Sequence, residues 1–277
     1  MSHDASQPLF VHVHIHKCAG TAFNELVRRS FAPYHLDAYI ANPFPSYQPA
    51  ELDNLVRRWP TVRSIASHSI RIYPQWIGNR RPLYVCFLRE PIDWFVSYLT
   101  YAQTHLHELT PEHVATFPPD AASMPLADLA AAMVQRFTTQ PTVYCTFIRY
   151  LAESAFRHAL SGLMDLPPID APLNGEPARL FDAMGLHMAQ RTLSRFFFVG
   201  VVEQMPQSLQ LLRQRLQQEG IELRPDPLPE VNVTRHKRDD LHWLSPDHPT
   251  GAMIRHWLKD DLKLYQWAAD RLASQAQ

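Results

Sequence analysis

Three histidines at alternate positions, His12, His14 and His16, stand directly before a lysine in the segment "VHVHIHKCAGTAF". Alternation with period two is typical of a half-buried β-strand, whose successive side chains point to opposite faces. Such imidazoles can bind a metal ion, as in metal-dependent barrel hydrolases, can line a strand face as hydrogen-bonded structural residues, or can serve a neighbouring anion site. A metal site needs further ligands at later strand ends and leaves the Lys-x-x-Gly-Thr turn unexplained, so the sequence favours the other two interpretations and no metal is predicted.

The sequence after the histidines, "KCAGTAFNELVRRSF", changes to helical spacing. We therefore expect a strand, a tight turn that contains Gly20, and a helix that begins near Thr21. Gly20 is one of only eight glycines in the chain and is expected to serve the backbone geometry of this turn. Loop amides and a helix N-terminus together form an anion site, and Lys17 adds a full positive charge to it.

Composition limits the class of protein. The 277 residues suffice for one large domain or two small ones, and 26 basic residues nearly balance 27 acidic ones. A balanced charge gives no global field that favours nucleic acid or a membrane surface. Three cysteines are too few for a disulfide framework, and no signal peptide or membrane span is recognisable. We expect a cytoplasmic protein with no nucleic-acid partner and no stable membrane insertion; the oligomeric state stays open.

Strands and helices are predicted to alternate along the chain. Apolar runs predict further strands at 62–70, 81–91 and 194–203, and helical spacing predicts helices at 49–59, 92–106, 205–220 and 251–273. This alternation predicts an α/β fold with three layers, α/β/α, around a central parallel sheet. We expect a single domain over residues 1–277. Parallel sheets bind ligands at the carboxyl ends of their strands, and Lys17, His68 and Arg89 all lie at predicted strand ends.

The segment "FLREPIDWFVSYL" carries a second pattern suited to an anion. Arg89 closes a buried strand, and Ser97 lies eight positions on, about two turns into the next helix and facing the loop that holds Arg89. A guanidinium group and a hydroxyl on one side suit a phosphate monoester. The alternative is an arginine paired with Glu90 or Asp93, together with a serine that faces solvent.

Several of these segments resemble motifs of the heparan-sulfate 2-O-sulfotransferase-like group of carbohydrate sulfotransferases. "HIHKCAGTAF" resembles the family's 5′-phosphosulfate loop, "FLREPIDWFVSYL" its 3′-phosphate motif, and "ASHSI" the segment that supplies a histidine base. "FFFVGVVEQMPQSLQLL", "VNVTRHKR" and "DDLKLYQWA" are similar to its later strand and helix, its closing basic loop and its C-terminal helix. The chain departs from the pattern at His16, Cys18 and Ala19, where the family often has proline, threonine and glycine.

The resemblance implies a P-loop-like sulfotransferase fold in a bacterial member of the family, with 3′-phosphoadenosine-5′-phosphosulfate (PAPS) as the donor and no metal. It implies that His68 takes the proton of an acceptor hydroxyl on a carbohydrate or other small molecule, while Lys17 stabilises the leaving phosphate. The competing candidates for the base are His16, His105 and His107. The residues implied to bind the donor are Lys17, Cys18, Ala19, Gly20, Thr21, Ala22, Arg89, Ser97 and Arg235, with Lys237 in the same closing loop.

Two other classes of function are weighed against sulfuryl transfer. A P-loop-like nucleotide kinase or NTPase needs the longer G-x-x-x-x-G-K-[ST] loop and a magnesium-binding acid, and that loop is absent from the sequence. A nucleotide-binding module without catalysis would not need Lys17, a candidate base and the Arg89/Ser97 pair together. The sequence therefore favours a sulfotransferase.

Overall fold

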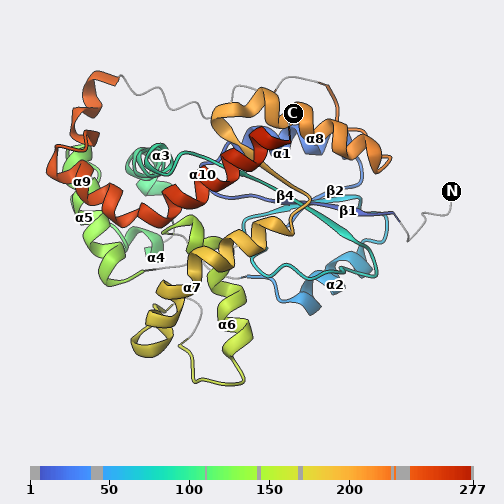
Figure 1. Ribbon diagram of the computed structural model, residues 1–277, viewed down its shortest axis with the longest axis horizontal. Helices are drawn as coiled ribbons and strands as arrows, with labels where there is room; N and C mark the ends of the chain where they lie inside the picture. The colour runs from blue at the N-terminus through green and yellow to red at the C-terminus, as the bar shows by residue number, and fades with distance from the viewer. Residues whose placement is uncertain are drawn as a thin grey trace.

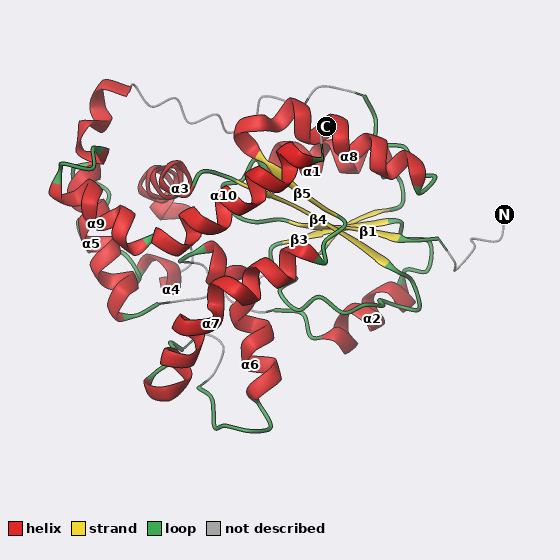
Figure 2. Ribbon diagram, in the orientation of Figure 1, coloured by secondary structure: helices red, strands yellow, loops and turns green. Residues whose placement is uncertain are grey.

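The computed structural model describes residues 7–38, 46–109, 111–141, 145–167, 171–225, 228 and 238–275. Its centre is a sheet of five strands in the order β2-β3-β1-β4-β5, and each neighbouring pair is parallel (Figures 1 and 2). The strands are β1 (Leu9–Val13), β2 (His35–Asp37), β3 (Ser64–Ser67), β4 (Pro82–Leu88) and β5 (Phe198–Val201). The predicted central parallel sheet is confirmed.

Helices cover both faces of this sheet, which confirms the three layers. In Figure 1, α1 and α8 lie above the sheet and α2 lies below it. The helices are α1 (Gly20–Phe31), α2 (Pro49–Arg58), α3 (Pro91–His105), α4 (Pro111–Val114), α5 (Leu126–Thr139), α6 (Ser154–Leu160), α7 (Gly175–Ser194), α8 (Met205–Gln218), α9 (Pro249–Trp257) and α10 (Lys259–Ser274). A π-helical turn, η2 (Arg149–Glu153), precedes α6, and the 3-10 turns are η1 (Leu106–Glu108), η3 (Val202–Gln204) and η4 (Arg238–Leu244).

The inner strands are buried on both faces because helices pack on each side of them. All five residues of β1 are buried, and in β4 only Pro82 is not. The prediction of a half-buried strand over the histidine row was therefore wrong. β1 ends at Val13, so His14 and His16 lie beyond the strand. His12 is 1% exposed, so the face of β1 that was expected to be polar is buried as well. The buried hydrophobic residues form one connected cluster that runs from Leu9 in β1 to Leu272 in α10.

Other predicted elements differ mainly in their ends. The three later strands are shorter than the apolar runs that predicted them, because residues such as Ile70 are buried beyond the last strand pairing. The helix predicted over 251–273 is two helices, α9 and α10, which meet at Leu258. β2 was missed: it has three residues and is held by its pairing with β3. No helix was predicted for the stretches that form α5, α6 and α7.

The parallel arrangement brings the ends of three adjacent strands to one edge. β3 ends at Ser67, directly before His68, and β4 ends at Leu88, directly before Arg89. Lys17 lies in the turn between β1 and α1. In Figure 2, helices α3, α5 and α9 gather beyond this edge, on the side of the molecule away from the N-terminus. We call this place the strand edge, defined by residues 14–22, 68 and 89.

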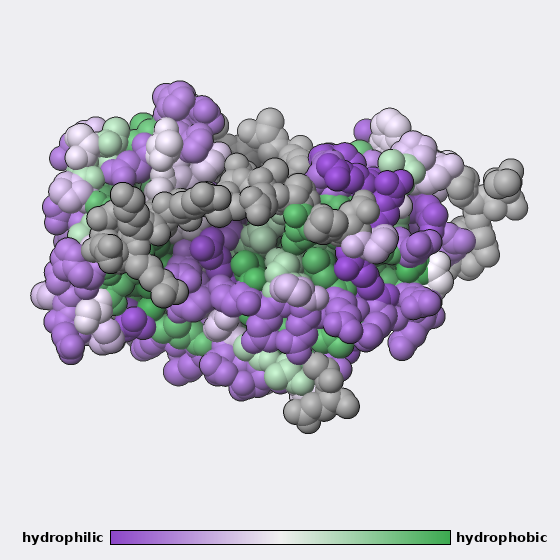
Figure 3. Space-filling view, turned by 90° about the horizontal axis from the view of Figure 1, so that it is seen from above, coloured by the Kyte–Doolittle hydropathy of each residue, from purple (hydrophilic) through white to green (hydrophobic). Residues whose placement is uncertain are grey.

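Hydrophilic side chains make up most of the coloured surface seen from above, with hydrophobic ones gathered toward the middle (Figure 3). Within the described ranges, no helix combines the length and the apolar character needed to cross a bilayer. All three cysteines, Cys18, Cys86 and Cys145, are buried and form no disulfide bond.

Candidate functional site

The turn between β1 and α1 leaves the N-terminus of the helix open toward the strand edge. Lys17 and Ala19 both have left-handed backbone conformations, with φ of 59° and 56°. Ala19 is the N-cap of α1 and has no side chain that can accept a hydrogen bond, and the first turn of α1 contains no acidic residue. The first amides of a helix have no partner within the helix, so this end of α1 presents donors and a positive partial charge. Such a turn is suited to an anion.

Gly20 is required for space and not for a special backbone angle. It is the first residue of α1, whereas the left-handed residues of the turn are Lys17 and Ala19. A Cβ atom at position 20 would lie 1.9 Å from Cδ2 of His14. Gly20 therefore lets the His14 ring lie directly against the start of α1. The prediction of a glycine in the loop was wrong in its placement and in its reason.

Lys17 and Arg89 bring two positive charges together beside this turn. Arg89 Nη1 lies 3.4 Å from the carbonyl oxygen of Lys17, and the Lys17 ammonium lies over the Tyr101 ring, 4.1 Å from its centroid. Within the described part of the chain, neither cation has a carboxylate at ion-pair distance. Burial and the neighbouring charge of Arg89 lower the pKa of Lys17. Two adjacent cations without a carboxylate partner favour binding of a polyanion.

The environment of Arg89 contradicts the alternative drawn from its sequence. Arg89 forms no ion pair with Glu90 or Asp93 in the described residues, and the Glu90 carboxylate accepts a hydrogen bond from the Asp93 backbone at 2.8 Å. Ser97 lies in the second turn of α3 and is 3% exposed, so it does not face solvent.

Histidine rings stack at the strand edge. The His16 and His68 rings are nearly parallel, with centroids 3.7 Å apart and an interplanar angle of 9°. The His14 ring lies on His68 at 3.9 Å and reaches His12 at 5.1 Å. Stacked rings do not direct their nitrogen atoms to one point. Among the described residues, no group of three or more His, Cys, Asp or Glu side chains is arranged to hold a metal ion.

The hydrogen bond of His68 fixes its tautomer. Its Nδ1 lies 2.5 Å from the carbonyl oxygen of His14. A carbonyl oxygen only accepts hydrogen bonds, so Nδ1 carries the hydrogen of the neutral ring and Nε2 carries the lone pair. In this tautomer, Nε2 is the ring atom that can accept a proton.

Burial keeps these histidines neutral. Desolvation lowers the pKa of His68 to about 4, with Arg71 acting in the same direction and the bond to His14 acting against it. Desolvation likewise lowers the pKa of His12 to about 3, and that of His14 well below its usual range. His68 therefore does not titrate near 6.5 as a free imidazole does: the ring is neutral throughout the physiological pH range, and it is a weaker base.

The competing histidines differ in position. His16 stacks on His68 and accepts, through its backbone carbonyl, a hydrogen bond of 2.8 Å from Trp94 Nε1. His105 stacks on the Tyr101 ring at 4.2 Å, on the same aromatic side chain that lies under Lys17. The His107 side chain is 75% exposed and faces Glu108. His16 and His105 therefore lie near the strand edge, whereas His107 lies at the surface.

The remaining predicted donor-site residues can contribute mainly through their backbone. The Cys18 side chain is 1% exposed, and burial raises the pKa of its thiol, so it is no thiolate at neutral pH. Ala22 is also buried, whereas Thr21 is exposed at the open end of α1. Arg235 and Lys237 lie outside the described residues.

Sequence reasoning missed several side chains that shape this site. Tyr101 lies under Lys17, Trp94 holds the His16 carbonyl, and the Tyr150 hydroxyl lies 2.8 Å from the His68 carbonyl oxygen. The Glu203 carboxylate accepts hydrogen bonds from the Glu90 backbone and the Tyr265 hydroxyl at the end of β5. The sequence could not reveal these contacts, because aromatic residues at helical spacing are equally typical of an ordinary hydrophobic core.

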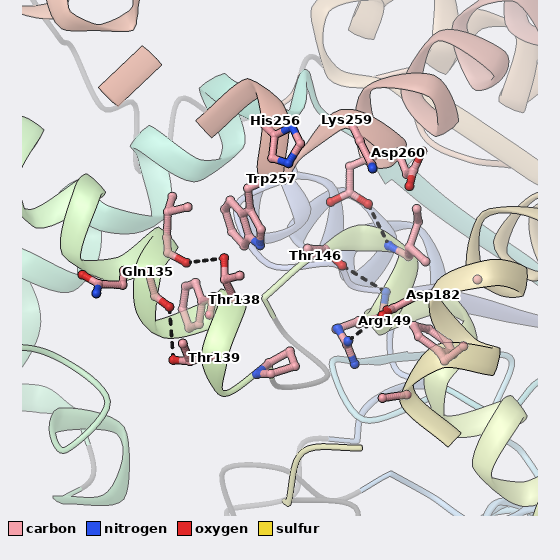
Figure 4. Close-up of a pocket in the computed structure, with 18 of the residues that line it drawn as sticks. Gln135, Thr138, Thr139, Thr146, Arg149, Asp182, His256, Trp257, Lys259 and Asp260 are labelled. Atoms are coloured by element: carbon pink, nitrogen blue, oxygen red, sulfur yellow. Dashed lines mark hydrogen bonds and ion pairs between the residues drawn. The ribbon is translucent and has the colours of Figure 1, made fainter. Parts of the chain in front are cut away.

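A cleft of about 1040 Å³ lies away from these residues, among α5, α7, α9 and the start of α10. Figure 4 shows Gln135 and Thr138 on one side, Arg149 and Asp182 on the other, and Trp257 above. Of the predicted site residues that the structure describes, none lines this cleft. Asp261, at its edge, is buried, and its carboxylate accepts hydrogen bonds from the backbone amides of Phe147 and Ile148.

A scan against protein-family models found no family whose model matches this chain, and a search of curated proteins found no significant match.

Proposed function

We propose that the strand edge binds PAPS and that the protein transfers its sulfuryl group to a hydroxyl of a carbohydrate or other small acceptor. One observation carries this proposal: Lys17 and Arg89 lie together at the open N-terminus of α1 with no carboxylate at ion-pair distance in the described residues. A lone cation at a protein surface is solvated, but two adjacent cations beside helix amides gain most from a ligand with several negative charges. PAPS is such a ligand.

The chemistry follows from where negative charge develops. The acceptor oxygen forms a bond to sulfur while the bond between sulfur and the 5′-phosphate oxygen breaks, and the acceptor proton moves to Nε2 of His68. 3′-Phosphoadenosine-5′-phosphate leaves with an added negative charge. Lys17 and the amides of Gly20 and Thr21 are the groups that would stabilise that charge, in the manner of phosphoryl transfer through a loose transition state.

Arg89 and Ser97 are proposed to hold the 3′-phosphate, which sets this donor apart from adenosine 5′-monophosphate. Arg89 follows β4 directly, and Ser97 is buried in the helix that follows it. A guanidinium group forms paired, charge-assisted hydrogen bonds with a phosphate. The central position of β1, with an anion-binding turn between it and α1, supports a P-loop-like type of sheet in a single catalytic domain.

A nucleotide kinase or NTPase would use a similar turn. Glu203, at the end of β5, is the residue that favours this second function. Its carboxylate reaches the backbone of Glu90, close to the cation pair, where a phosphotransferase would need an acid for magnesium. A module that binds nucleotides without catalysis would need neither the tautomer of His68 nor its stacking on His16, the residue before Lys17.

The test is a transfer assay with PAPS carrying labelled sulfate and a panel of oligosaccharide and small hydroxyl acceptors, run beside ATP carrying labelled γ-phosphate. We expect sulfate transfer that falls about 10²–10⁴-fold in His68→Ala without loss of donor-product binding, because this is what a positioned base contributes. Phosphate transfer from ATP in place of sulfate transfer would establish the kinase alternative. Binding of 3′-phosphoadenosine-5′-phosphate with no transfer to any acceptor would support the module without catalysis.

A further inference from the structure

The Tyr150 hydroxyl lies where the ends of β1 and β3 meet. It is 2.8 Å from the carbonyl oxygen of His68 and 3.3 Å from that of His14. The same His14 carbonyl accepts the Nδ1 hydrogen of His68. A phenol has one hydrogen, so Tyr150 donates chiefly to the nearer carbonyl of His68, with the His14 carbonyl as a weaker second acceptor. One hydroxyl thus contacts both backbone groups that determine where the His68 ring lies.

The surroundings of Tyr150 are rigid. Its side chain is 2% exposed, and it belongs to the π-helical turn η2, a rare element that often occurs at functional sites. Asp261 caps the start of this helix by accepting the backbone hydrogens of Phe147 and Ile148. On the other side, the Arg71 guanidinium lies 5.6 Å from the centroid of the Tyr150 ring. A buried phenol in such packing cannot rotate freely, so its hydroxyl is a fixed point for the strand ends.

We propose that Tyr150 is a positioning residue for His68: it ties the carbonyls of His14 and His68 together and thereby keeps Nδ1–H on His14 and Nε2 toward the acceptor. This inference rests on the proposed function, in which His68 is the base. Without the hydroxyl, the His14 carbonyl can turn away from the ring. The ring then loses both its preferred tautomer and its orientation, although it remains in the site.

The groups that face His68 determine its pKa. They are His14 and His16 from the end of β1 and the turn after it, Arg71 from the segment after β3, and Tyr150 from η2. The charge of His68 also acts on His12, whose ring lies 5.1 Å from that of His14. Desolvation is the largest cause of the low pKa of His68. Loosening of the ring should therefore raise that pKa toward 6.5, because water reaches the imidazolium form.

The test compares Tyr150→Phe with Tyr84→Phe. Tyr84 is a matched control because it is also buried and also donates from its hydroxyl to a backbone carbonyl, that of Pro74 at 2.9 Å, on a different part of the sheet. Histidine ring NMR, with the His68 signals assigned by their loss in His68→Ala, measures tautomer and titration in the free protein. Steady-state kinetics and calorimetry measure transfer and donor-product binding.

We expect Tyr150→Phe to raise the pKa of His68, to mix its tautomers, and to lower kcat about 10–100-fold with unchanged donor-product affinity. Tyr84→Phe should leave all of these at the wild-type values. In a His68→Ala background, Tyr150→Phe should lower kcat no further, because the residue acts through His68. Wild-type tautomer, titration and kcat in Tyr150→Phe would overturn the inference.

Two results keep this inference separate from the proposed function. If no transfer is found with any acceptor but Tyr150→Phe still shifts the His68 titration, the positioning role stands and the sulfotransferase proposal falls. If Tyr150→Phe does not fold, 3-fluorotyrosine at position 150 replaces it, because fluorine preserves the shape and makes the phenol a stronger donor. The His68 nitrogen signals should then shift, and unchanged signals would contradict a positioning role.

Discussion

The strand edge and the cleft differ in how their charges are balanced. In the cleft, Arg149 pairs with Glu153 at 2.7 Å and with Asp182 at 3.7 Å, and Asp260 pairs with Lys263 at 2.8 Å. At the strand edge, the charge of Arg89 acts on Lys17, and neither cation has a carboxylate at ion-pair distance in the described residues. The cleft is a large hollow in which Arg149 and Asp260 are paired, whereas the positive charges of Lys17 and Arg89 at the strand edge are not balanced by a carboxylate within the described part of the chain. We infer that an anion site is marked by its charge balance and not by the size of the hollow.

Burial acts on both regions with opposite consequences for protons. At the edge, desolvation lowers the pKa of His68 to about 4, so the ring is neutral because it has lost its proton. Beside the cleft, desolvation raises the pKa of Asp261 to about 7, so the carboxyl is neutral when it keeps its proton. In each case the buried group avoids its charged form. Only at the edge does the neutral form suit a base near neutral pH.

The largest expected effect comes from removing the ammonium group of the edge. Lys17→Ala should lower kcat about 10²–10³-fold and change donor-product affinity less, because the leaving oxygen carries more charge in the transition state than in the ground state. The matched control is Lys263→Ala, which removes an ammonium already paired with Asp260 near the cleft. Steady-state kinetics and calorimetry give both quantities. An equal loss of kcat in the two variants would show that the ammonium group at the strand edge is no more important for transfer than the one near the cleft.

The pH dependence of transfer tests whether the edge holds a neutral histidine. Because burial lowers the pKa of His68 to about 4, kcat/KM of the wild type should be nearly constant from pH 8 down to pH 5.5 and fall only below that. A base with the ordinary pKa of 6.5 would instead be about thirtyfold less active at pH 5 than at pH 8. A fall in kcat/KM with its midpoint near pH 6.5 would show that the His68 ring is not desolvated in the unliganded protein.

Gly20→Ala should disturb the edge through packing. The added Cβ would overlap the His14 ring, against which His68 stacks, and such overpacking costs about 1–3 kcal/mol of unfolding free energy. Gly162→Ala is the control, since its Cβ would meet no atom within 4 Å. Urea unfolding of the two variants measures the difference. A Gly20→Ala protein as stable as Gly162→Ala would mean that the His14 ring does not lie against α1.

The smallest expected effect is on the pH dependence of stability. The lowered pKa of the buried histidines contributes stability that is present above pH 6.5 and lost as the pH falls through their folded-state pKa values, about 4 for His68. The raised pKa of Asp261 has the opposite sign: its contribution is present below its unfolded pKa near 3.9 and is lost as the pH rises to about 7.

Asp261→Asn removes the second of these contributions. Between pH 4.5 and 6.5 the stability of the variant should therefore rise with pH more steeply than that of the wild type, by at most about 1.4 kcal/mol per pH unit for one proton. Urea unfolding at several pH values gives the two slopes. Parallel slopes would mean that Asp261 is ionised across this range and that its burial does not govern its titration.

Sequence patterns predicted the parts of the fold that depend on local periodicity. The alternation of strands and helices gave the parallel sheet, and the positions of Lys17, His68 and Arg89 at strand ends gave their common edge. This works because the carboxyl ends of parallel strands must meet on one side, whatever the details of packing.

What the sequence did not predict depends on contacts between distant segments. β1, including His12, is buried on both faces because helices cover both sides of the sheet. Position 20 requires a glycine because the His14 ring lies against it. The pKa of His68 depends on burial beneath its neighbours, and Tyr150 reaches the site from 82 positions away in the sequence. None of these is encoded in spacing along one element.

The most direct test of the central claim is calorimetry of 3′-phosphoadenosine-5′-phosphate against adenosine 5′-monophosphate, with wild type, Arg89→Ala and Arg81→Ala. Arg81 is the control because it lies next to the other end of β4 and pairs with Glu219. The wild type should prefer the bisphosphate. Arg89→Ala should weaken its binding by about 1.5–3 kcal/mol and leave the monophosphate unchanged, while Arg81→Ala affects neither. Equal affinities of the wild type for both nucleotides, or equal losses for both in Arg89→Ala, would contradict an anion site for a 3′,5′-bisphosphate at the strand edge.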